Sequence, residues 1–196
     1  MTVTVAPSPR RPISTDVARF DSRVDDWFAQ HLRGRPVADR VFYSASALGD
    51  HGTIWLILAA IRGLRSDEGP PAAVRAAAGV GIESVLVNGP IKWMFRRQRP
   101  VLIGDRPLPL RRPRTSSFPS GHATSAFCAA ALLSDGDEKW APLYYGLALV
   151  VAWSRVHVRI HHASDVVAGM AIGALLGELS RRMVRLPRPA PPSSGI

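Results

Sequence analysis

Residues 154–165 combine arginine, histidine and aspartate between two apolar runs of the sequence. His161 and Asp165 are four positions apart, so on a helix their side chains would lie on the same face. An aspartate in that place accepts the N–H of one imidazole nitrogen and leaves the other nitrogen with a free lone pair, which is what a nucleophile or a general base needs. Arg155 adds a guanidinium group, which suits a phosphate. Taken alone, the pattern fits a capped helix end with charges in water equally well.

An earlier segment supplies further positive charge. Lys92 and Arg99 are seven positions apart, which predicts one face of a helix, and Pro100 follows directly. Together with Arg155 they provide fixed positive charge that could neutralise the non-bridging oxygens of a phosphate ester. These cations can do what a metal ion does in other enzymes, and the chain shows no cysteine and histidine spacing typical of a metal site. We therefore expect no metal and no cofactor.

A third segment places a histidine at the start of an apolar run. In Pro119-Ser120-Gly121-His122, Ser120 can cap a helix, and the Gly121 amide would then point at the space before that helix, where an anion is stabilised. Glycine there removes the side chain that would block an approaching group. His122 stands where it could donate a proton. A histidine that makes only a local hydrogen bond at a helix start is the alternative.

In chain order the three segments read K-x6-R-P, P-S-G-H and S-R-x5-H-x3-D. This pattern resembles the signature of the type-2 phosphatidic acid phosphatase superfamily, which also includes bacterial class A acid phosphatases and vanadium haloperoxidases. Each segment alone is weak evidence, but eleven specified residues in the right order are specific. They span residues 92–165, a little over a third of the chain.

The resemblance implies an enzyme and assigns roles to these side chains. His161, oriented by Asp165, would attack phosphorus and form a phosphohistidine, while His122 would protonate the leaving oxygen and then activate water. The residues expected to bind the phosphate are Lys92, Arg99, Ser120, Gly121 and Arg155. The residues outside the signature, for which we expect structural roles only, are Arg96, His157, Arg159 and His162.

The composition bears on the partners of the protein. The 25 Lys and Arg residues outnumber the 15 Asp and Glu residues, and the net charge of +10 would by itself also suit a nucleic-acid-binding protein. The arginines, however, lie in the tails and in the loop 101–118, and they do not alternate with aromatic residues on one recognition helix. Anionic lipid head groups and phosphate fit this layout better. We expect a membrane and a phosphorylated lipid as partners, and no nucleic acid.

The apolar runs predict an all-α fold, a polytopic membrane helical bundle with about five spanning helices. These helices are expected at residues 38–63, 72–95, 122–134, 140–153 and 163–183. Several of the runs are shorter than the ~20 residues of an isolated spanning helix, and a soluble bundle would show similar runs. Few charges interrupt them, however, and the alternation of the helices would bring all three signature segments to one membrane face.

Three further features of these helices carry specific expectations. Glu83 interrupts an apolar helix, so its carboxylate should face the bundle rather than lipid. Glycines recur at four-residue spacing at positions 169, 173 and 177, which permits a neighbouring helix to approach closely. The Gly-Pro-Pro tripeptide at 69–71 should interrupt any helix, so we expect a turn at 66–71.

The ends of the chain differ from the apolar domain. From Val17 to Phe28, apolar residues recur with helical spacing among charged ones. This predicts an amphipathic helix that lies at the membrane interface or packs on the surface of its own domain. The expected organisation is a disordered N-terminus and this helix in residues 1–36, a membrane phosphatase domain in 37–183 and a disordered tail in 184–196.

These observations together predict a membrane-bound lipid phosphate phosphatase. Its substrate would be phosphatidate, phosphatidylglycerophosphate, or a polyprenyl phosphate or diphosphate. The alternatives are a haloperoxidase-like enzyme that holds vanadate and a non-catalytic membrane protein that binds anionic lipid, although lipid binding alone needs no nucleophile. We expect a multi-pass protein of the cell membrane. By resemblance to the lipid phosphatases of the family, its site would lie on the outer face, and the oligomeric state is left open.

Overall fold

The computed structural model describes residues 14–65, 69–101, 107–108, 110, 113 and 115–186, and every regular element in these ranges is helical. The predicted all-α fold is confirmed. The longer helices are α1 (Thr15–His31), α2 (Pro36–Leu48), α3 (Thr53–Arg65), α4 (Gly69–Leu86), α6 (Gly121–Ser134), α7 (Ala141–His157) and α8 (Ala163–Met183). The short helical segments are Asp50–Gly52, Val87–Ile91, α5 (Lys92–Met94) and Glu138–Trp140.

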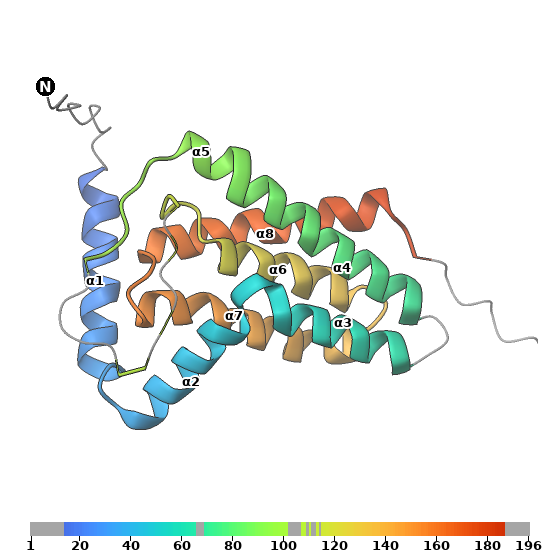
Figure 1. Cartoon of the computed structure of the whole chain (residues 1–196), viewed down its shortest axis with the longest axis horizontal. Coiled ribbons are helices and arrows are strands. Elements are labelled where there is room, and N and C mark those ends of the chain that lie inside the picture. Colours follow the sequence, from blue (N-terminus) through green and yellow to red (C-terminus); the bar gives the residue numbers. More distant parts are fainter. Residues whose placement is uncertain are drawn as a thin grey trace, which may run out of the picture.

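Helix α6 lies at the centre of a bundle formed with α3, α4, α7 and α8 (Figure 1). Its sequence is rich in alanine, and its residues from Ala123 onward are buried with the exception of Phe127, which is partly buried. Small side chains allow the surrounding helices to approach it from all sides. Trp55 of α3 and Tyr144 of α7 pack into the same apolar core. This core sets the positions of the helix ends that carry the signature segments.

A close contact between α6 and α8 depends on the glycines of α8. A Cβ atom at Gly169 would lie 2.7 Å from the carbonyl O of Ser120, and one at Gly173 would lie 2.2 Å from the carbonyl O of Thr124. Gly177 meets the backbone of α6 in the same way. No side chain fits at such distances, so the predicted close approach is confirmed. It holds the start of α8 against the start of α6.

The single helix expected at 38–63 is wrong, because the chain breaks there into α2 and α3. His51 has a φ of 56° and Gly52 a φ of 71°, and both values lie outside the right-handed helical region. A Cβ atom at Gly49, just before the break, would lie 2.7 Å from the ring of His122. Helix α2 therefore leaves the bundle at an angle, whereas α3 runs along it (Figure 1).

Two other helix ends differ from the expectation. Helix α4 already begins at Gly69, so the turn expected at 66–71 is wrong for its last three residues. Prolines are tolerated in the first turn of a helix, because the N–H group that they lack has no partner there. Helix α7 continues to His157, one turn beyond the expected end at residue 153. The reason is that Ser154 and Arg155 are buried polar residues, which a hydrophobicity pattern does not place inside a helix.

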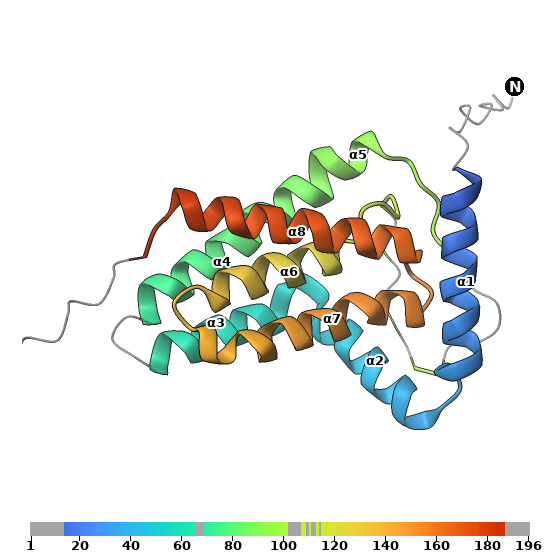
Figure 2. The ribbon, with the colours of Figure 1, turned by 180° about the vertical axis from the view of Figure 1, so that it is seen from behind.

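Helix α1 crosses the end of the bundle instead of running along it (Figure 2). Its Phe28 is 5% exposed and packs with Ala152 and Val156 of α7, whereas Phe20 and Trp27 are 42% and 50% exposed. The predicted helix is present, and it packs on its own domain while it presents aromatic side chains outward. Its position at a membrane interface stays a prediction.

By length and composition, α8 is the one helix among the described residues that qualifies as a membrane span. The count of five spans and the domain boundaries after residues 36 and 183 therefore stay predictions. The terminal residues 1–13 and 187–196, for which we expect disorder, lie outside the described residues, as do all arginines of the loop 101–118.

Candidate active site

The three signature segments meet at the end of the bundle that α1 crosses (Figure 1). The starts of α6 and α8, the end of α7 and the segment after α5 all lie there. Between them is a cavity of about 580 Å³. The predicted site residues that line it are Lys92, Gly121, His122, Arg155 and His161. Arg99 lines a neighbouring cavity of about 660 Å³, which shares Lys92 and Thr115 with the first.

His161 is positioned by the turn between α7 and α8. The backbone N–H groups of Ile160 and His161 both donate to the carbonyl O of Arg155, at 3.0 and 3.1 Å. His162 then caps α8, so that Asp165 is the third residue of this helix. His161 Nδ1 lies 3.6 Å from Asp165 Oδ2, and the two side chains are 2% and 0% exposed. The predicted pair therefore comes together, at a separation longer than a hydrogen bond.

Donors from three other positions hold the carboxylate of Asp165. Arg97 Nη1 donates to Oδ1 at 2.5 Å, and the hydroxyl of Ser117 donates to Oδ2 at 2.5 Å. The backbone N–H of His162 donates to Oδ2 at 2.9 Å. Sequence reasoning did not identify Arg97 or Ser117. The one available signal is that Arg97 lies within the unspecified positions of the first motif.

The other ring nitrogen of His161, Nε2, faces a cation. Arg99 Nη1 donates to it at 3.1 Å and also donates to the carbonyl O of Ile160 at 3.0 Å. Burial most of all, together with the positive charges of Arg155 and Arg99, lowers the pKa of His161 to about 3 against the opposing effect of Asp165. The imidazole is therefore neutral at neutral pH. Its Nε2 lone pair accepts the N–H of Arg99, beside the place where the cations could hold a phosphate.

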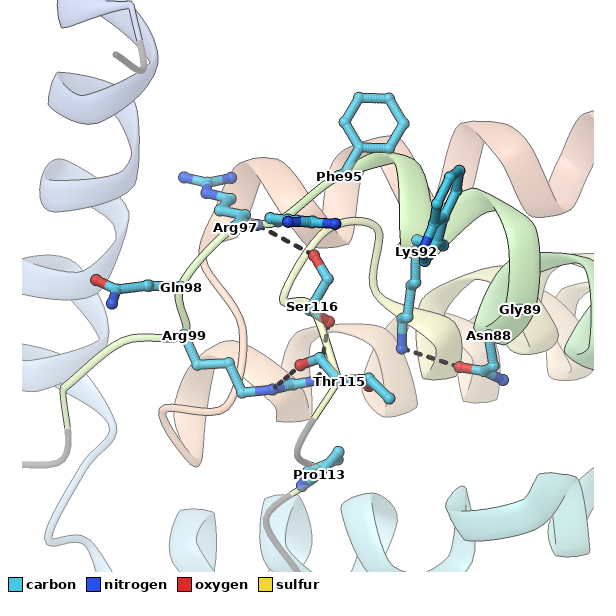
Figure 3. A pocket seen from close by; sticks show the side chains of 12 residues that line it. Asn88, Gly89, Lys92, Phe95, Arg97, Gln98, Arg99, Pro113, Thr115 and Ser116 are labelled. Carbon is cyan, nitrogen blue, oxygen red and sulfur yellow. Dashed lines mark hydrogen bonds between the residues drawn. The ribbon is translucent and has the colours of Figure 1, made fainter. Parts of the chain in front are cut away.

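Lys92 and Arg99 reach the site in a way that differs from the expectation. Helix α5 ends at Met94, and Arg99 lies on an extended segment, so the shared helical face predicted for the two residues is wrong. Figure 3 shows that both side chains nevertheless extend toward the same space. Arg99 is held there by the carbonyl O of Thr115, at 3.2 Å from Nε, and by that of Ser116, at 3.1 Å from Nη2.

Gly121, the first residue of α6, lies next to the ammonium group of Lys92. Lys92 Nζ donates to Asn88 Oδ1 at 2.9 Å (Figure 3). A Cβ atom at Gly121 would lie 3.0 Å from Asn88 Oδ1 and 3.5 Å from Lys92 Nζ. Glycine therefore leaves open the space that an anion would occupy between the ammonium group and the start of the helix.

Arg155 lies in the last turn of α7, whereas the sequence predicted a loop after residue 153. Its side chain is 1% exposed, and its Nη1 donates to the hydroxyl of Ser46 on α2. The same part of α2 contacts His122, because His122 Nε2 lies 3.2 Å from the carbonyl O of Ser46. Helix α2, which carries no signature residue, thus positions two signature residues.

His122 has a carboxylate partner that sequence reasoning did not identify. Its Nε2 lies 3.1 Å from Oδ1 of Asp50, in the break between α2 and α3. Spacing along the chain pairs only His161 with an acid, whereas in the structure each of the two histidines has a carboxylate within 3.6 Å. The only sequence signal for Asp50 is a charged residue within an otherwise apolar stretch.

Ser120 connects two of the signature segments. Its hydroxyl accepts the N–H of Ala123 at 3.5 Å and so caps α6, as predicted, while its own N–H donates to the carbonyl O of Asp165 at 3.0 Å. Ser120 is fully buried and is not among the residues that line the cavity. Its hydroxyl is engaged at the start of α6, so the contact with phosphate expected for Ser120 stays a prediction.

Three of the four residues expected to be structural, His157, Arg159 and His162, have partners of this kind, whereas Arg96 is exposed and lines the cavity that contains Arg99. His157 Nε2 lies 2.7 Å from Asp39 Oδ1, and His162 caps α8. Glu83 is buried and accepts the hydroxyl of Ser125 at 2.5 Å, which confirms that it faces the bundle. Among the residues that the structure describes, no three His, Cys, Asp or Glu side chains gather as metal ligands would.

Comparison with known proteins identifies the family of this chain. The model of the PAP2 superfamily matches residues 72–188. Over 175 residues, 88% of this chain and 90% of the relative, the chain is 35% identical to a decaprenylphosphoryl-5-phosphoribose phosphatase of Mycobacterium tuberculosis. It is also 30% identical to a putative undecaprenyl-diphosphatase of Escherichia coli, over 52% of this chain and 51% of that protein.

Two solved structures have a similar fold. A transmembrane PAP2 type phosphatidylglycerolphosphate phosphatase from Bacillus subtilis superposes with a TM-score of 0.65 at 22% identity, over 87% of each chain. LpxE of Aquifex aeolicus superposes with a TM-score of 0.63 at 26% identity, over 80% of this chain and 93% of that one. The family match over more than half of the chain and the 35% identity show that this protein is a phosphatase of the PAP2 superfamily.

Proposed function

We propose that the protein is a membrane-bound phosphatase that removes a phosphate group from a lipid through a phosphohistidine intermediate. The observation that carries this proposal is the cavity between the three signature segments. It is lined by Lys92, Arg155 and His161 together with apolar side chains of α3 and α4, among them Leu56 and Val85. Such a cavity suits a substrate that has an anionic head and a hydrocarbon chain.

The proposed reaction has two steps, and the site residues take the roles that the signature predicts. Lys92, Arg99 and Arg155 neutralise the non-bridging oxygens, with help from the Gly121 amide at the start of α6. Nε2 of His161 then forms a bond to phosphorus while the bond between phosphorus and the leaving oxygen breaks. The other ring nitrogen of His161, Nδ1, faces the carboxylate of Asp165. This carboxylate stabilises the positive charge that develops on the imidazole ring.

His122 handles the protons in this scheme. In the first step it gives a proton to the leaving oxygen, and the Asp50 carboxylate stabilises the imidazolium form that this requires. In the second step the neutral His122 takes a proton from a water molecule, whose oxygen bonds to phosphorus as the bond to His161 Nε2 breaks. Inorganic phosphate leaves, and both histidines return to their starting states.

The relatives suggest which lipid to test first. Those that match this chain include a polyprenylphosphoryl sugar-phosphate phosphatase and a polyprenyl diphosphatase. The similarity to the former extends over 90% of its length. We therefore rank a phosphorylated head group on a polyprenyl carrier first among the substrates, ahead of phosphatidylglycerophosphate and phosphatidate.

Membrane insertion with several spans, as predicted from the sequence, is supported by the surface of the bundle. Large apolar side chains are exposed on several helices, and those on α3, α4 and α8 include Ile57, Ile61, Ile82, Val85, Leu175 and Leu179. Apolar surface on this scale favours contact with lipid. In this arrangement the cavity opens at one membrane face, which we assign to the outer face, and α1 lies in the interface.

The test is phosphate release by the purified protein in detergent micelles against a panel of lipid phosphates, with rapid-quench detection of acid-labile phosphoenzyme. The wild-type protein should turn over at least one polyprenyl-linked substrate. His161→Ala should lose both turnover and phosphoenzyme, whereas His122→Ala should still form phosphoenzyme from p-nitrophenyl phosphate, whose leaving group needs no proton. A label that persists in His161→Ala would disprove the assignment of the nucleophile. Binding of these lipids without turnover would instead support a non-catalytic protein.

A further inference from the structure

Arg97 joins two buried carboxylates that come from different parts of the chain. Its Nη1 donates to Asp165 Oδ1 at 2.5 Å, and its Nη2 donates to Asp21 Oδ2 at 2.6 Å. The side chains of Arg97, Asp21 and Asp165 are 13%, 8% and 0% exposed, so solvent screens these contacts little. A guanidinium fork that is shared in this way fixes the orientation of both carboxylates.

Asp21 lies on α1 and also holds the start of α8. Its Oδ1 accepts the backbone N–H of Ser164 at 2.8 Å, and its Oδ2 accepts the hydroxyl of Ser164 at 2.9 Å. The same hydroxyl accepts a hydrogen bond from Arg97 Nη1 at 2.8 Å. Ser164 directly precedes Asp165, so α1 is attached to the helix turn that carries the predicted partner of the nucleophile.

These contacts form a continuous path from α1 to the nucleophile. Arg97 holds the Oδ1 side of the Asp165 carboxylate, and the Oδ2 side lies 3.6 Å from His161 Nδ1. Rotation of this carboxylate would change the distance to the imidazole that it is expected to orient. If Asp21 and Arg97 are lost, Asp165 keeps only the hydroxyl of Ser117 and the backbone N–H of His162 as the hydrogen-bond donors described here.

We propose that Asp21 and Arg97 are positioning residues for the hydrolysis proposed above: through them, α1 fixes the orientation of Asp165 and, with it, that of the His161 imidazole. The inference rests on the proposed function. Helix α1 is then required for the chemical step, although its role is to position Asp165 and not to touch the substrate.

The simpler explanation is that Asp21 only attaches α1 to the bundle, and the chain offers a matched control for it. Asp25 lies one turn further along α1 and accepts a hydrogen bond from Arg33. Arg33 also donates to the carbonyl O atoms of Val156 and His157, at 2.8 and 2.9 Å. Asp25→Asn therefore weakens a second attachment of α1 without touching any signature side chain.

The experiment compares wild type, Asp21→Asn, Arg97→Lys and Asp25→Asn as full-length proteins in detergent micelles. For each we would measure kcat and KM for a lipid phosphate, the single-turnover rate of phosphoenzyme formation and the midpoint of thermal unfolding. Asp21→Asn and Arg97→Lys should lower kcat and the rate of phosphoenzyme formation by about tenfold or more. Removal of the groups that orient metal-binding histidines has effects of this size. Their KM should change less than about threefold, because in this proposal both residues act through Asp165 and not on the substrate.

Asp25→Asn should stay within about twofold of wild type in kcat, even where its unfolding midpoint falls as far as that of Asp21→Asn. Arg97→Lys keeps the positive charge between the carboxylates, so it remains informative if Asp21→Asn does not fold. Equal rates of phosphoenzyme formation in Asp21→Asn and Asp25→Asn, or wild-type kcat in Arg97→Lys, would overturn the proposal. Absence of turnover in the wild-type protein would overturn the proposed function itself. This result differs from a loss that is confined to the variants.

Discussion

Asp50 Oδ1 lies 3.1 Å from Nε2 of His122, although the two residues belong to different helical segments and only His122 is part of the signature. The carboxylate comes from the break between α2 and α3, and the break exists because His51 and Gly52 leave the helical conformation. The site thus contains two pairs of histidine and aspartate. One is expected to serve the nucleophile, and the other is placed to serve proton transfer.

We predict that Asp50→Asn lowers kcat by roughly 100-fold for a lipid phosphate, because the amide cannot stabilise the imidazolium form of His122. The loss should be much smaller with p-nitrophenyl phosphate, whose leaving group needs no proton. Asp39→Asn is the matched control, since it removes the carboxylate partner of His157 outside the cavity. An equal loss with both substrates would show that Asp50 does not act through proton transfer.

Gly121→Ala should weaken the binding of phosphate and vanadate by about tenfold, which corresponds to about 1.4 kcal/mol. The added Cβ atom would lie 3.5 Å from Lys92 Nζ and 3.0 Å from Asn88 Oδ1, where the anion is expected. The measurement is the inhibition constant of orthovanadate. Gly146→Ala on α7 serves as control, because nothing lies within 4 Å of its added Cβ atom. Unchanged inhibition in Gly121→Ala would place the phosphate elsewhere.

The protonation of His161 leads to a prediction about pH. Burial, followed by the charges of Arg155 and Arg99, lowers its pKa to about 3, so the neutral form should persist as the pH falls from about 8 to about 5. Arg99→Gln removes a positive charge and should raise this pKa. The ring resonances of protein labelled with ¹⁵N-histidine would show it, with the signal assigned by its loss in His161→Gln. A His161 signal that titrates near the ordinary value of about 6.5 would contradict the expectation.

Turnover should not require an added divalent metal ion, because Lys92, Arg99 and Arg155 supply the positive charge that the transferred group needs. Activity should survive an excess of EDTA. Orthovanadate should inhibit, since it imitates the five-coordinate state of phosphorus at the same cations. A complete loss in EDTA that is restored by a metal ion would refute this prediction.

Local signals account for the parts of the fold that were predicted correctly. Helix α8 runs from Ala163 to Met183, as expected, and α6 begins one residue before the expected position. Asp165 and Ser120 cap these helices through contacts within a few residues. The four-residue spacing of the glycines in α8 indicates that another helix packs closely against it. By contrast, the division of 38–63 into α2 and α3 comes from the positive φ values of His51 and Gly52, which the hydrophobic pattern does not reveal.

The sequence by itself determined the signature groups of the candidate site, because the order and spacing of the three motifs are specific. Only the tertiary structure decided how these groups are supported. Asp50, Arg97 and Asp21 enter through contacts between residues far apart in the chain, and spacing carries no information about such contacts. Arg97 and Ser117 hold the Asp165 carboxylate, and the His161 ring lies 3.6 Å from it. The distance between His161 and Asp165 therefore depends on Arg97 and Ser117, which the four-residue spacing of the pair does not reveal.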